Sequence, residues 1–524
     1  MAAEIELRLA LPRGAVPALL RHPALAAARS GRGRRARLVA TYFDTPDGKL
    51  AAAGLGLRLR HEDGRWVQTL KGPPLPASSA ALVVRDEFET PLAGPELDPE
   101  ALAGSPWAEP VADALADPSL GPRFVTDFWR HTIPLRFDGA TTARLCVDGG
   151  ELRDPDGERR REISEVEIEL VAGAAIDLFA FAATLSADLP LSVALAGKAE
   201  RGHALVRNAP DGWHQPLRAL APVYPADGDA ATALAAIVRE CTRQIAGNAA
   251  GLLADDDPEW VHQMRVGTRR LRACLAIAAP LLPPPGVDAL RAGLRQLAEA
   301  LGACRDLDVF DDALLRPLAA AAGAESELAA ALAPLQDATR AARDRARAAA
   351  RAFVGSARFT RLVLALGALG TLPRLGVAPV IAADDPLGQP VAAFAATLLR
   401  RRRRRVGARG AKLAEAGVDE LHALRIAAKK LRYAAEFFAP AFAHGKRARA
   451  FAQSVAELQD LLGEVNDGAS ALRIVAALGE GEPSHAAAAG GIAGWTAARR
   501  VAALAALPAA WKSFRRAPRF WRGD

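Results

Sequence analysis

The chain has 524 residues, a hydrophobic share of 51% and a formal net charge of +7. This length exceeds one typical domain and predicts two or three domains with sizeable cores. The four cysteines show no CxxC spacing, which argues against a zinc site or a disulfide framework and favours reduced thiols. No apolar run of about 18 residues indicates a membrane span, and no signal-peptide pattern opens the chain. We therefore expect a cytoplasmic protein without a membrane partner.

The first 208 residues predict an α+β domain. Turn residues separate the predicted strands, among them Glu62-Asp63-Gly64 and the stretch from Asp148-Gly149-Gly150 to Asp156-Gly157. Helical segments are predicted near 14–28, 98–116 and 175–188. The predicted strands are 3–11, 36–44, 55–62, 65–71, 82–90, 124–137, 142–148 and 163–171. Eight mainly antiparallel strands are enough to close a barrel, and closure removes exposed strand edges.

Four segments of this domain place charged side chains on alternate residues, where residues of a strand share one face. These segments are Glu4 to Arg8, Leu57 to Arg60, Arg85 to Glu89 and Glu165 to Glu169. Each mixes an ionic face with an apolar face. Such alternation fits a closed barrel with a charged lumen, and it also fits a solvated outer face. The first arrangement implies function, because buried charge is costly unless it is paired or binds ions.

The charged residues of these strands are suited to a polyphosphate ligand. Paired carboxylates bind hard cations such as Mg²⁺ or Mn²⁺, usually together with phosphate oxygens. Guanidinium groups bind phosphate in a bidentate manner, and lysine acts as a point charge. The candidate phosphate-binding residues are Arg8, Arg58, Arg60, Lys71, Arg85, Arg130 and Lys198.

Six segments, in this order along residues 1–208, resemble the motifs of the CYTH family, the triphosphate tunnel metalloenzymes. They are Glu4 to Arg8 (the ExExK signature), Tyr42 to Thr45 (YFDT), Leu57 to Arg60 with Gln68 to Gly72 (LRxR and TLK), Arg85 to Glu89 (RxExE), Glu165 to Leu170 (the late acidic strand) and Gly197 to Gly202 (KxxRG). A single ExExK match is weak, whereas the ordered set is specific. The signature lysine is replaced by Arg8 here.

This resemblance implies an eight-stranded tunnel, a substrate with a triphosphate group and a divalent metal. The implied metal ligands are Glu4, Glu6, Glu165 and Glu167. The seven basic residues named above would contact the triphosphate, with Lys71 and Arg8 in the catalytic role. Three other motif residues also have interpretations without a functional role. Asp44 could cap a turn, and Glu89 or Glu169 could face solvent.

A stretch rich in Pro, Gly and Asp at 209–228 predicts a linker. Residues 229–515 then predict an all-α region, which we interpret as duplicated four-helix bundles over about 229–367 and 390–515. Acidic residues outnumber basic ones before this region, and basic residues predominate within it. The helical half is therefore expected to prefer an anionic partner.

The duplication is visible in one motif, H-x-x-R-x-x-x-(R/K)-(R/K)-L-R. Its cationic residues fall on one helical stripe in each copy. They are His262, Arg265, Arg269 and Arg272 in the first copy, and His422, Arg425, Lys429 and Arg432 in the second. Two related stripes predict one basic channel. The run from Arg400 to Arg405 is basic on every face of a helix, so part of it is solvated or contacts a ligand.

This helical half resembles the CHAD domain, a resemblance that covers about 229–515 and implies binding of inorganic polyphosphate by the eight residues of the two stripes. Metal binding by the two histidines is a weaker alternative, because no further His or Cys stands at ligand spacing. Nucleic acid also carries phosphate, but aromatic residues form only 5% of the chain and do not interleave with the stripes.

Together these patterns predict a hydrolase that converts inorganic triphosphate to diphosphate and phosphate, fused to a polyphosphate-binding domain that can place it at polyphosphate granules. The alternatives are thiamine-triphosphatase or adenylate cyclase activity in the tunnel, and a polyphosphate-binding scaffold with little activity.

Overall fold

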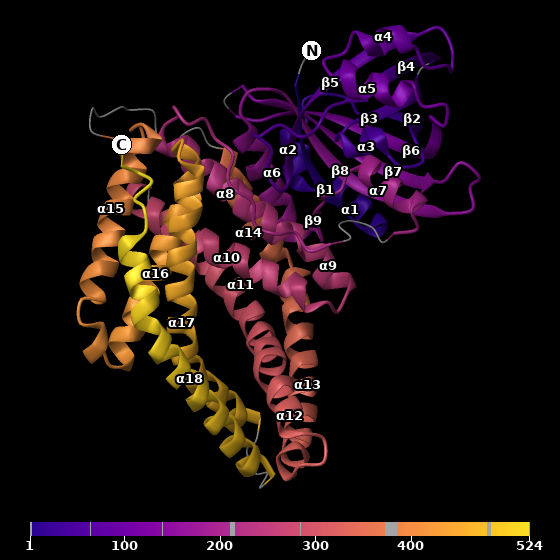
Figure 1. The fold of residues 1–524 in the computed structure, drawn as a ribbon. Coiled ribbons are helices and arrows are strands. Elements are labelled where there is room, and N and C mark those ends of the chain that lie inside the picture. The colour runs from indigo at the N-terminus through magenta and orange to yellow at the C-terminus, as the bar shows by residue number, and fades with distance from the viewer. Residues whose placement is uncertain are drawn as a thin grey trace. The chain divides into compact units, whose positions relative to one another are not determined.

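A computed structural model describes residues 3–62, 64–138, 140–209, 215–282, 284–371, 385–478 and 484–522 (Figure 1). The chain divides into two compact units. The first, here called the barrel unit, comprises Met1–Arg218, Val238–Asp256 and Val354–Leu372. The second, the helical unit, comprises Ala219–Ile237, Asp257–Phe353 and Pro373–Asp524. The domain boundaries expected at 208 and 229 remain predictions.

The barrel unit contains a closed antiparallel sheet. Its strands are β1 (Ala3–Ala10), β2 (Arg34–Asp44), β3 (Gly56–Glu62), β4 (Arg65–Lys71), β5 (Leu82–Leu92), β6 (Gly121–Arg136), β7 (Thr142–Arg153) and β8 (Arg160–Ala172). Neighbouring strands pair in the order β5-β4-β3-β2-β6-β7-β8-β1, and β1 also pairs with β5, which closes the ring. The short β9 (Ser192–Val193) adds to one end of β1. The predicted eight-stranded antiparallel barrel is confirmed.

Short helices cover the outside of this barrel. They are α1 (Val16–Leu20), α2 (Pro23–Ala28), α3 (Lys49–Ala52), α4 (Pro99–Ala103), α5 (Ala108–Leu115) and α6 (Ala175–Asp188). Helix α7 (Lys198–Val206) instead packs on the inner face of the sheet, where Leu205 joins a cluster with Leu38 and Phe128. The apolar faces of several strands point outward against the six outer helices. Leu7 and Leu9 of β1, for example, are completely buried in one cluster with Phe179 of α6. Burial of these side chains stabilises the fold by roughly 1.5–3 kcal/mol each.

Strand β7 differs from the sequence-based prediction, which ended it at 148. The strand continues to Arg153, and Gly149 and Gly150 are paired residues within it. A Cβ at Gly150 would lie 2.4 Å from the Cα of Phe128, so this glycine permits close approach of β6. The turn lies further on, where Gly157 has a φ of +73°. The interpretation of Asp148-Gly149-Gly150 as hairpin residues was therefore wrong.

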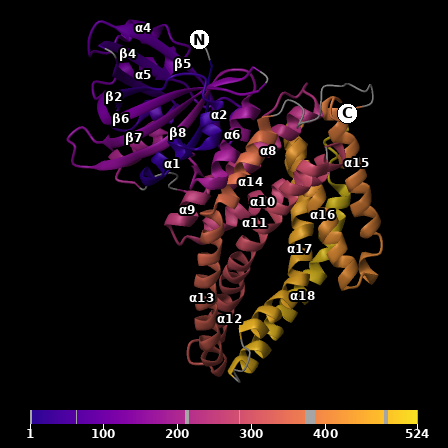
Figure 2. The same cartoon turned by 180° about the vertical axis from the view of Figure 1, so that it is seen from behind.

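A helix from far along the chain completes the core of the barrel unit. Helix α14 (Ala357–Thr371) packs on α6, as both views show (Figure 2). Leu364 is completely buried in the cluster that contains Phe179. The hydroxyl of Thr360 donates a hydrogen bond of 2.9 Å to the carbonyl of Leu191. The barrel core thus depends on residues about 150 positions downstream of it in the sequence.

The helical unit confirms the predicted all-α class in the part of the chain that the structure describes. Its long helices are α10 (Pro258–Ala278), α11 (Pro284–Phe310), α13 (Glu327–Val354), α15 (Val391–Arg409), α16 (Val418–Phe438), α17 (Gly445–Leu478) and α18 (Ser484–Arg516), with the short α12 (Arg316–Ala322) after α11. Helix α8 (Ala230–Gly247) is divided between the units, and α9 (Ala249–Ala254) belongs to the barrel unit. The two motif copies lie on α10 and α16, each followed by the helix it packs against, α11 or α17.

Among the described helices, none is by itself long and apolar enough to cross a membrane. Only the bent pair of α13 and α14 reaches that length and composition when the two are taken together.

We expect Leu364→Ala to lower the free energy of unfolding of the barrel unit by about 2–5 kcal/mol, because it leaves a cavity in a closely packed core. Equilibrium unfolding of the full chain in guanidinium chloride measures this change. Leu504→Ala is the matched control, since Leu504 is 37% exposed on α18. Equal shifts in the two variants would contradict a core role for α14.

Candidate functional site

A cavity of about 520 Å³ lies inside the barrel and is lined mainly by charged side chains. This volume falls within the range of small-ligand sites. The basic residues of its lining are Arg8, Arg34, Arg58, Arg60, Lys71, Arg85, Arg130, Arg144 and Lys198. The acidic residues are Glu4, Glu6, Glu62, Glu87, Glu89, Glu167, Glu169 and Glu200. Each tunnel residue predicted from the sequence therefore lines this cavity except Glu165, which contacts Lys198.

The strand register explains why these charges share one space. Along the pairing of β1 with β8, Glu6 lies opposite Glu169 and Arg8 lies opposite Glu167. Residues directly opposite on neighbouring strands share a face of the sheet. Because the alternate residue Leu7 faces the outer apolar cluster, the ionic face is the lumen. The alternative of a solvated outer face does not apply to these strands.

One ion-pair cluster in the lumen surrounds Lys71 of β4. Its Nζ lies 2.9 Å from Oε2 of Glu4 and also contacts Glu87. Burial and the nearby Arg58 lower the pKa of Lys71, but Glu4 and Glu87 outweigh them and raise it. Lys71 therefore stays charged near neutral pH.

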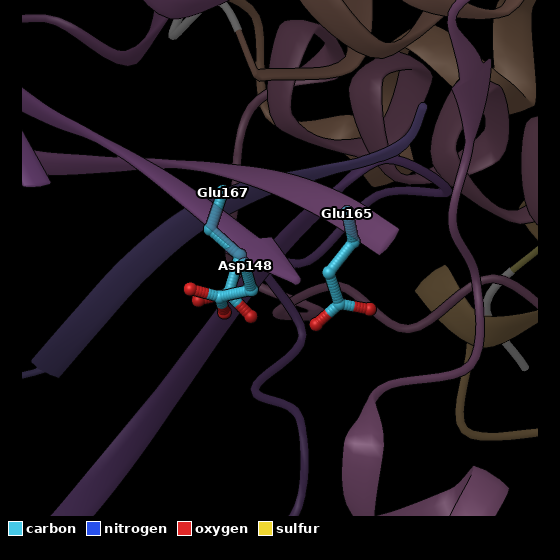
Figure 3. A group of neighbouring side chains, drawn as sticks. All are labelled: Asp148, Glu165 and Glu167. Carbon is cyan, nitrogen blue, oxygen red and sulfur yellow. The ribbon is translucent and has the colours of Figure 1, made fainter. Parts of the chain in front are cut away.

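A second cluster joins three carboxylates, Asp148 of β7 with Glu165 and Glu167 of β8 (Figure 3). All three residues are buried, and one oxygen from each lies within 4.8 Å of the others. The Nζ of Lys198 lies 2.7 Å from Asp148 and 2.8 Å from Glu167, and it also contacts Glu165. Arg130 forms two hydrogen bonds with Asp148, of 2.8 and 2.7 Å, and contacts Glu167.

The carboxylates of the lumen differ in how readily they ionise. Burial raises the pKa of Glu6 and of Glu165, and the charge of Glu167 raises both further. At Glu167 itself burial acts in the same direction, but Lys198 and Arg130 overcome it and hold the pKa well below the usual range. All of these carboxylates can therefore be ionised together only when positive charges lie close to them in the cavity.

The triad of Asp148, Glu165 and Glu167 fits a hard divalent cation. It supplies carboxylate oxygens close enough to converge on one ion, and Mg²⁺ and Mn²⁺ prefer such ligands. Figure 3 shows the three carboxylate groups on the same side of their strands, with Asp148 and Glu167 adjacent. Two of the predicted ligands, Glu165 and Glu167, belong to this triad. The sequence analysis missed Asp148, because its neighbouring glycines indicated a turn.

The two other predicted ligands lie elsewhere in the same lumen. Glu4 pairs with Lys71, and Glu6 lies 3.5 Å from Nε of Arg8. They line the cavity together with Glu167 and can therefore reach the same ligand. Their assignment as metal ligands remains a prediction.

Four predicted phosphate-binding arginines carry buried donors without a hydrogen-bond partner in the described structure. These donors are Nε of Arg8, Arg58 and Arg60, and both Nε and Nη2 of Arg85. A buried donor left without an acceptor costs about 1–3 kcal/mol. Phosphate oxygens in the cavity would supply the acceptors that these guanidinium groups lack. This is the strongest structural indication that the lumen binds an anion.

Three residues with open interpretations can now be placed. Asp44 caps α3, because its carboxylate accepts hydrogen bonds from the backbone of Leu50 and Ala51. Glu169 lines the cavity and lies 3.2 Å from Arg130, so it does not face outside solvent. Glu89 also lines the cavity, but 46% of its side chain is exposed.

A second cavity, of about 640 Å³, lies within the helical unit. Four of the eight predicted polyphosphate-binding residues line it, namely His262, Arg265, Arg269 and Arg425. The repeat motif did not point to the other arginines of its lining, which are Arg305, Arg473 and Arg499. Of the remaining predicted residues, Arg272 and His422 are exposed, and Arg432 pairs with Glu436 on its own helix.

The two basic stripes meet at Lys429 of α16. Burial lowers the pKa of Lys429 to about 8, and the charges of Arg269, Arg425, Arg265 and Arg272 act in the same direction. Arg269 of α10 also donates a hydrogen bond to the hydroxyl of Tyr433 on α16. Cations from both copies of the motif are thus close enough to repel each other, as the predicted channel requires.

Acidic residues compensate part of this charge. Arg265 lies 2.9 Å from Asp306, and Arg499 lies 3.1 Å from Glu464. His262 lies on the same stripe, and burial together with Arg305 lowers its pKa. His262 is therefore mostly neutral near pH 7.

Family models match both halves of the chain. The CYTH domain matches residues 2–202, and the CHAD domain matches residues 236–476. The chain carries a CYTH domain followed by a CHAD domain. The closed barrel is the structure of the CYTH domain, and the lumen cavity is the CYTH tunnel. The CHAD match covers most of the helical unit together with α9 and α14, which belong to the barrel unit.

Known proteins resemble each domain. An inorganic triphosphatase of Haemophilus influenzae is 34% identical over 165 residues, which are 32% of this chain and 45% of that protein. The match thus spans less than half of that relative. The CHAD domain of the plant Ricinus communis is 31% identical, with 59% of this chain and 99% of that chain covered and a TM-score of 0.49. A putative adenylyl cyclase from Hippeastrum, described as having a dominant triphosphatase activity, is 20% identical, with 39% and 95% covered and a TM-score of 0.28.

If the triad binds a divalent ion, Asp148→Asn should weaken Mn²⁺ binding about tenfold or more, because one ligand charge is removed. Isothermal titration calorimetry with Mn²⁺ measures the affinity. Asp127→Asn is the control, since Asp127 pairs with the exposed Arg37 on the outside of the barrel. Unchanged affinity in Asp148→Asn would exclude the triad as the metal site.

Proposed function

We propose that the CYTH tunnel is a metal-dependent triphosphatase whose substrate is inorganic triphosphate. One water molecule is added across a terminal phosphoanhydride bond, and diphosphate and phosphate leave. The observation that carries this proposal is that arginines with unpartnered donors, Arg58 and Arg85, line the same cavity as Glu167 of the carboxylate triad. The relative from Haemophilus influenzae, named an inorganic triphosphatase, supports the same reaction class.

The basic residues supply most of the substrate binding in this proposal. Arg8, Arg58, Arg60, Arg85 and Arg130 offer bidentate guanidinium groups, and Lys71 and Lys198 offer point charges. A bound Mg²⁺ or Mn²⁺, held by the triad with Glu4 and Glu6, would neutralise charge on the phosphoryl oxygens.

Two of these residues are assigned the catalytic role. Lys71 stays protonated because of Glu4 and Glu87, so it can stabilise the charge that develops on the leaving diphosphate. Arg8 is the second such group, at the position of the signature lysine. Water-poor surroundings strengthen both interactions relative to bulk solvent.

The lining of the tunnel favours an inorganic substrate over ATP or thiamine triphosphate. Its two aromatic residues are already engaged. Tyr42 stacks on Phe124 with ring centroids 4.5 Å apart, and Phe128 lies under the ammonium of Lys198 at 5.0 Å. A base or thiazole ring could stack only on the remaining faces of these two rings, because no other described lining residue is aromatic.

The helical domain is proposed to bind inorganic polyphosphate. Support comes from the cavity of six arginines between the two motif helices and their neighbours, and from the mutual repulsion of the cations around Lys429. Phosphate chains would relieve that repulsion. Such binding would place the enzyme at polyphosphate stores.

A phosphate-release assay on triphosphate, thiamine triphosphate, ATP and long-chain polyphosphate, with and without Mg²⁺, tests the proposal. We expect release from triphosphate only with metal, and its loss in the double variant Glu4→Ala/Glu6→Ala. A scaffold with an inactive tunnel would retain polyphosphate yet release no phosphate from any substrate.

Arg58→Ala should lower kcat/KM for triphosphate roughly 100-fold, since it removes a buried guanidinium that faces the substrate. Arg37→Ala, on the outer surface of β2, is the matched control and should leave kcat/KM unchanged. Circular dichroism confirms that both variants remain folded. Equal activity in the two would argue against phosphate binding by Arg58.

Polyphosphate binding should weaken as pH rises above about 8, because Lys429 loses the proton that makes it attractive to phosphate. Below that pH the residue is charged and the affinity is full. Binding is measured by fluorescence anisotropy of labelled polyphosphate at constant salt. Lys429→Arg should remove the change between pH 7 and 9, whereas Lys446→Arg, at an exposed position of α17, should keep it. Preference for duplex DNA at matched salt would favour a nucleic-acid ligand.

A further inference from the structure

The start of α7 lies against the end of the Arg8 side chain. Arg8 is 6% exposed, and Gly197, the residue before α7, is also buried and lines the same cavity. A Cβ on Gly197 would lie 2.1 Å from Nη1 of Arg8 and 3.4 Å from its Cζ. The backbone of Gly197 has a φ of −79°, which any residue adopts. A Cβ would also meet Oε2 of Glu200 at 2.9 Å. The space taken by Arg8 and Glu200, rather than the backbone, therefore requires glycine at this position.

Glu200 supplies negative charge at the same place. Its Oε2 accepts a hydrogen bond of 2.9 Å from the backbone N–H of Gly197. Its depth in the protein opposes ionisation, but the charges of Arg8 and Arg85 outweigh this effect and lower its pKa. An ionised carboxylate, fixed by the first turn of α7, therefore faces the two guanidinium groups.

We propose that Gly197 and Glu200 are positioning residues that hold the guanidinium of Arg8 at the tunnel wall, where it binds a phosphate of the substrate. Gly197 provides the room for the fork of the arginine, and Glu200 provides a second countercharge in addition to Glu6. This inference rests on the proposed triphosphatase function and deepens it.

The geometry predicts how strongly the effect of a substitution at position 197 depends on the side chain at position 8. An added Cβ at 197 would push Nη1 from 2.1 Å to an ordinary contact distance of about 3.5 Å, a shift of about 1.4 Å. A displacement of this size at a reacting group can lower a rate about 100-fold. A lysine at position 8 ends near the place of Cζ, which a Cβ at 197 would meet at 3.4 Å, an ordinary contact.

The test is a double-mutant cycle on the full chain, with kcat and KM for triphosphate hydrolysis at saturating Mg²⁺. Gly197→Ala should lower kcat/KM about 10- to 100-fold in the presence of Arg8. In the Arg8→Lys background the same substitution should lower kcat/KM clearly less, because only the 2.9 Å contact of the Cβ with Oε2 of Glu200 remains. Gly14→Ala is the control, since no atom lies within 4 Å of a Cβ there. Its kcat/KM should equal that of the wild type.

Glu200→Gln tests the second residue. It removes a negative charge from the wall but keeps the shape, so KM for the anionic substrate should not rise. We expect kcat to fall about tenfold, because the guanidinium is no longer fixed in the productive orientation. A general loss of structure would instead lower the melting temperature of the protein, which thermal denaturation measures.

The outcomes separate this inference from the function on which it rests. A wild type that releases no phosphate from triphosphate contradicts the proposed function and overturns both. An active wild type in which Gly197→Ala has no effect, or has the same effect with Arg8 and with lysine at position 8, overturns the inference alone. An unchanged kcat in Glu200→Gln would show that Glu200 does not position Arg8.

Discussion

Compensation between buried acids and buried bases is the constraint on which the barrel depends. Taking one carboxylate or ammonium group out of water costs several kcal/mol, and only close, hydrogen-bonded partners offset this cost. Lys198 contacts all three carboxylates of the triad, and Arg130 contacts two of them. Because strand closure directs these side chains into one lumen, none can turn to bulk solvent without opening the sheet. The buried acids and bases of the barrel are therefore stable only in the presence of one another.

The same compensation explains which ligand suits the lumen. A pure anion would pair with the cations and leave Glu165 and Glu167 without partners. A lone metal ion would bind the carboxylates and leave Lys198 without a partner. A divalent cation together with a short phosphate chain satisfies both groups at once, since carboxylates and phosphate oxygens share the metal while ammonium and guanidinium groups take the remaining oxygens. The chemistry of the proposed reaction thus follows from the charge pattern of the strands.

Much of this site could be predicted from the sequence, because strand alternation gives the face of each residue independently of tertiary structure. Alternation placed the charged residues of each strand, such as Glu165 and Glu167, on one face, but it fitted a lumen and a solvated outer face equally. The resemblance to the CYTH family decided for the tunnel and implied the roles of Lys71, Glu165 and Glu167. Asp148 was missed because two glycines after an aspartate usually form a turn, whereas here they allow β6 to approach. The close approach of Gly197 to Arg8 was equally invisible, since it depends on residues nearly 190 positions apart.

The placement of α14 shows a limit of a different kind. Its sequence is apolar and helical like that of its neighbours in the chain, and nothing in its periodicity distinguishes a partner in α6 from a partner in α13. The outer apolar face of a closed barrel must be covered, however, and Leu364 covers part of it. The barrel core is complete only after more than 360 residues have been synthesised, which adds contacts of high sequence separation and should slow its folding. The barrel unit is therefore built from segments that flank α10 to α13 in the sequence, so that a cell that makes the complete barrel core must also make these helices of the CHAD domain.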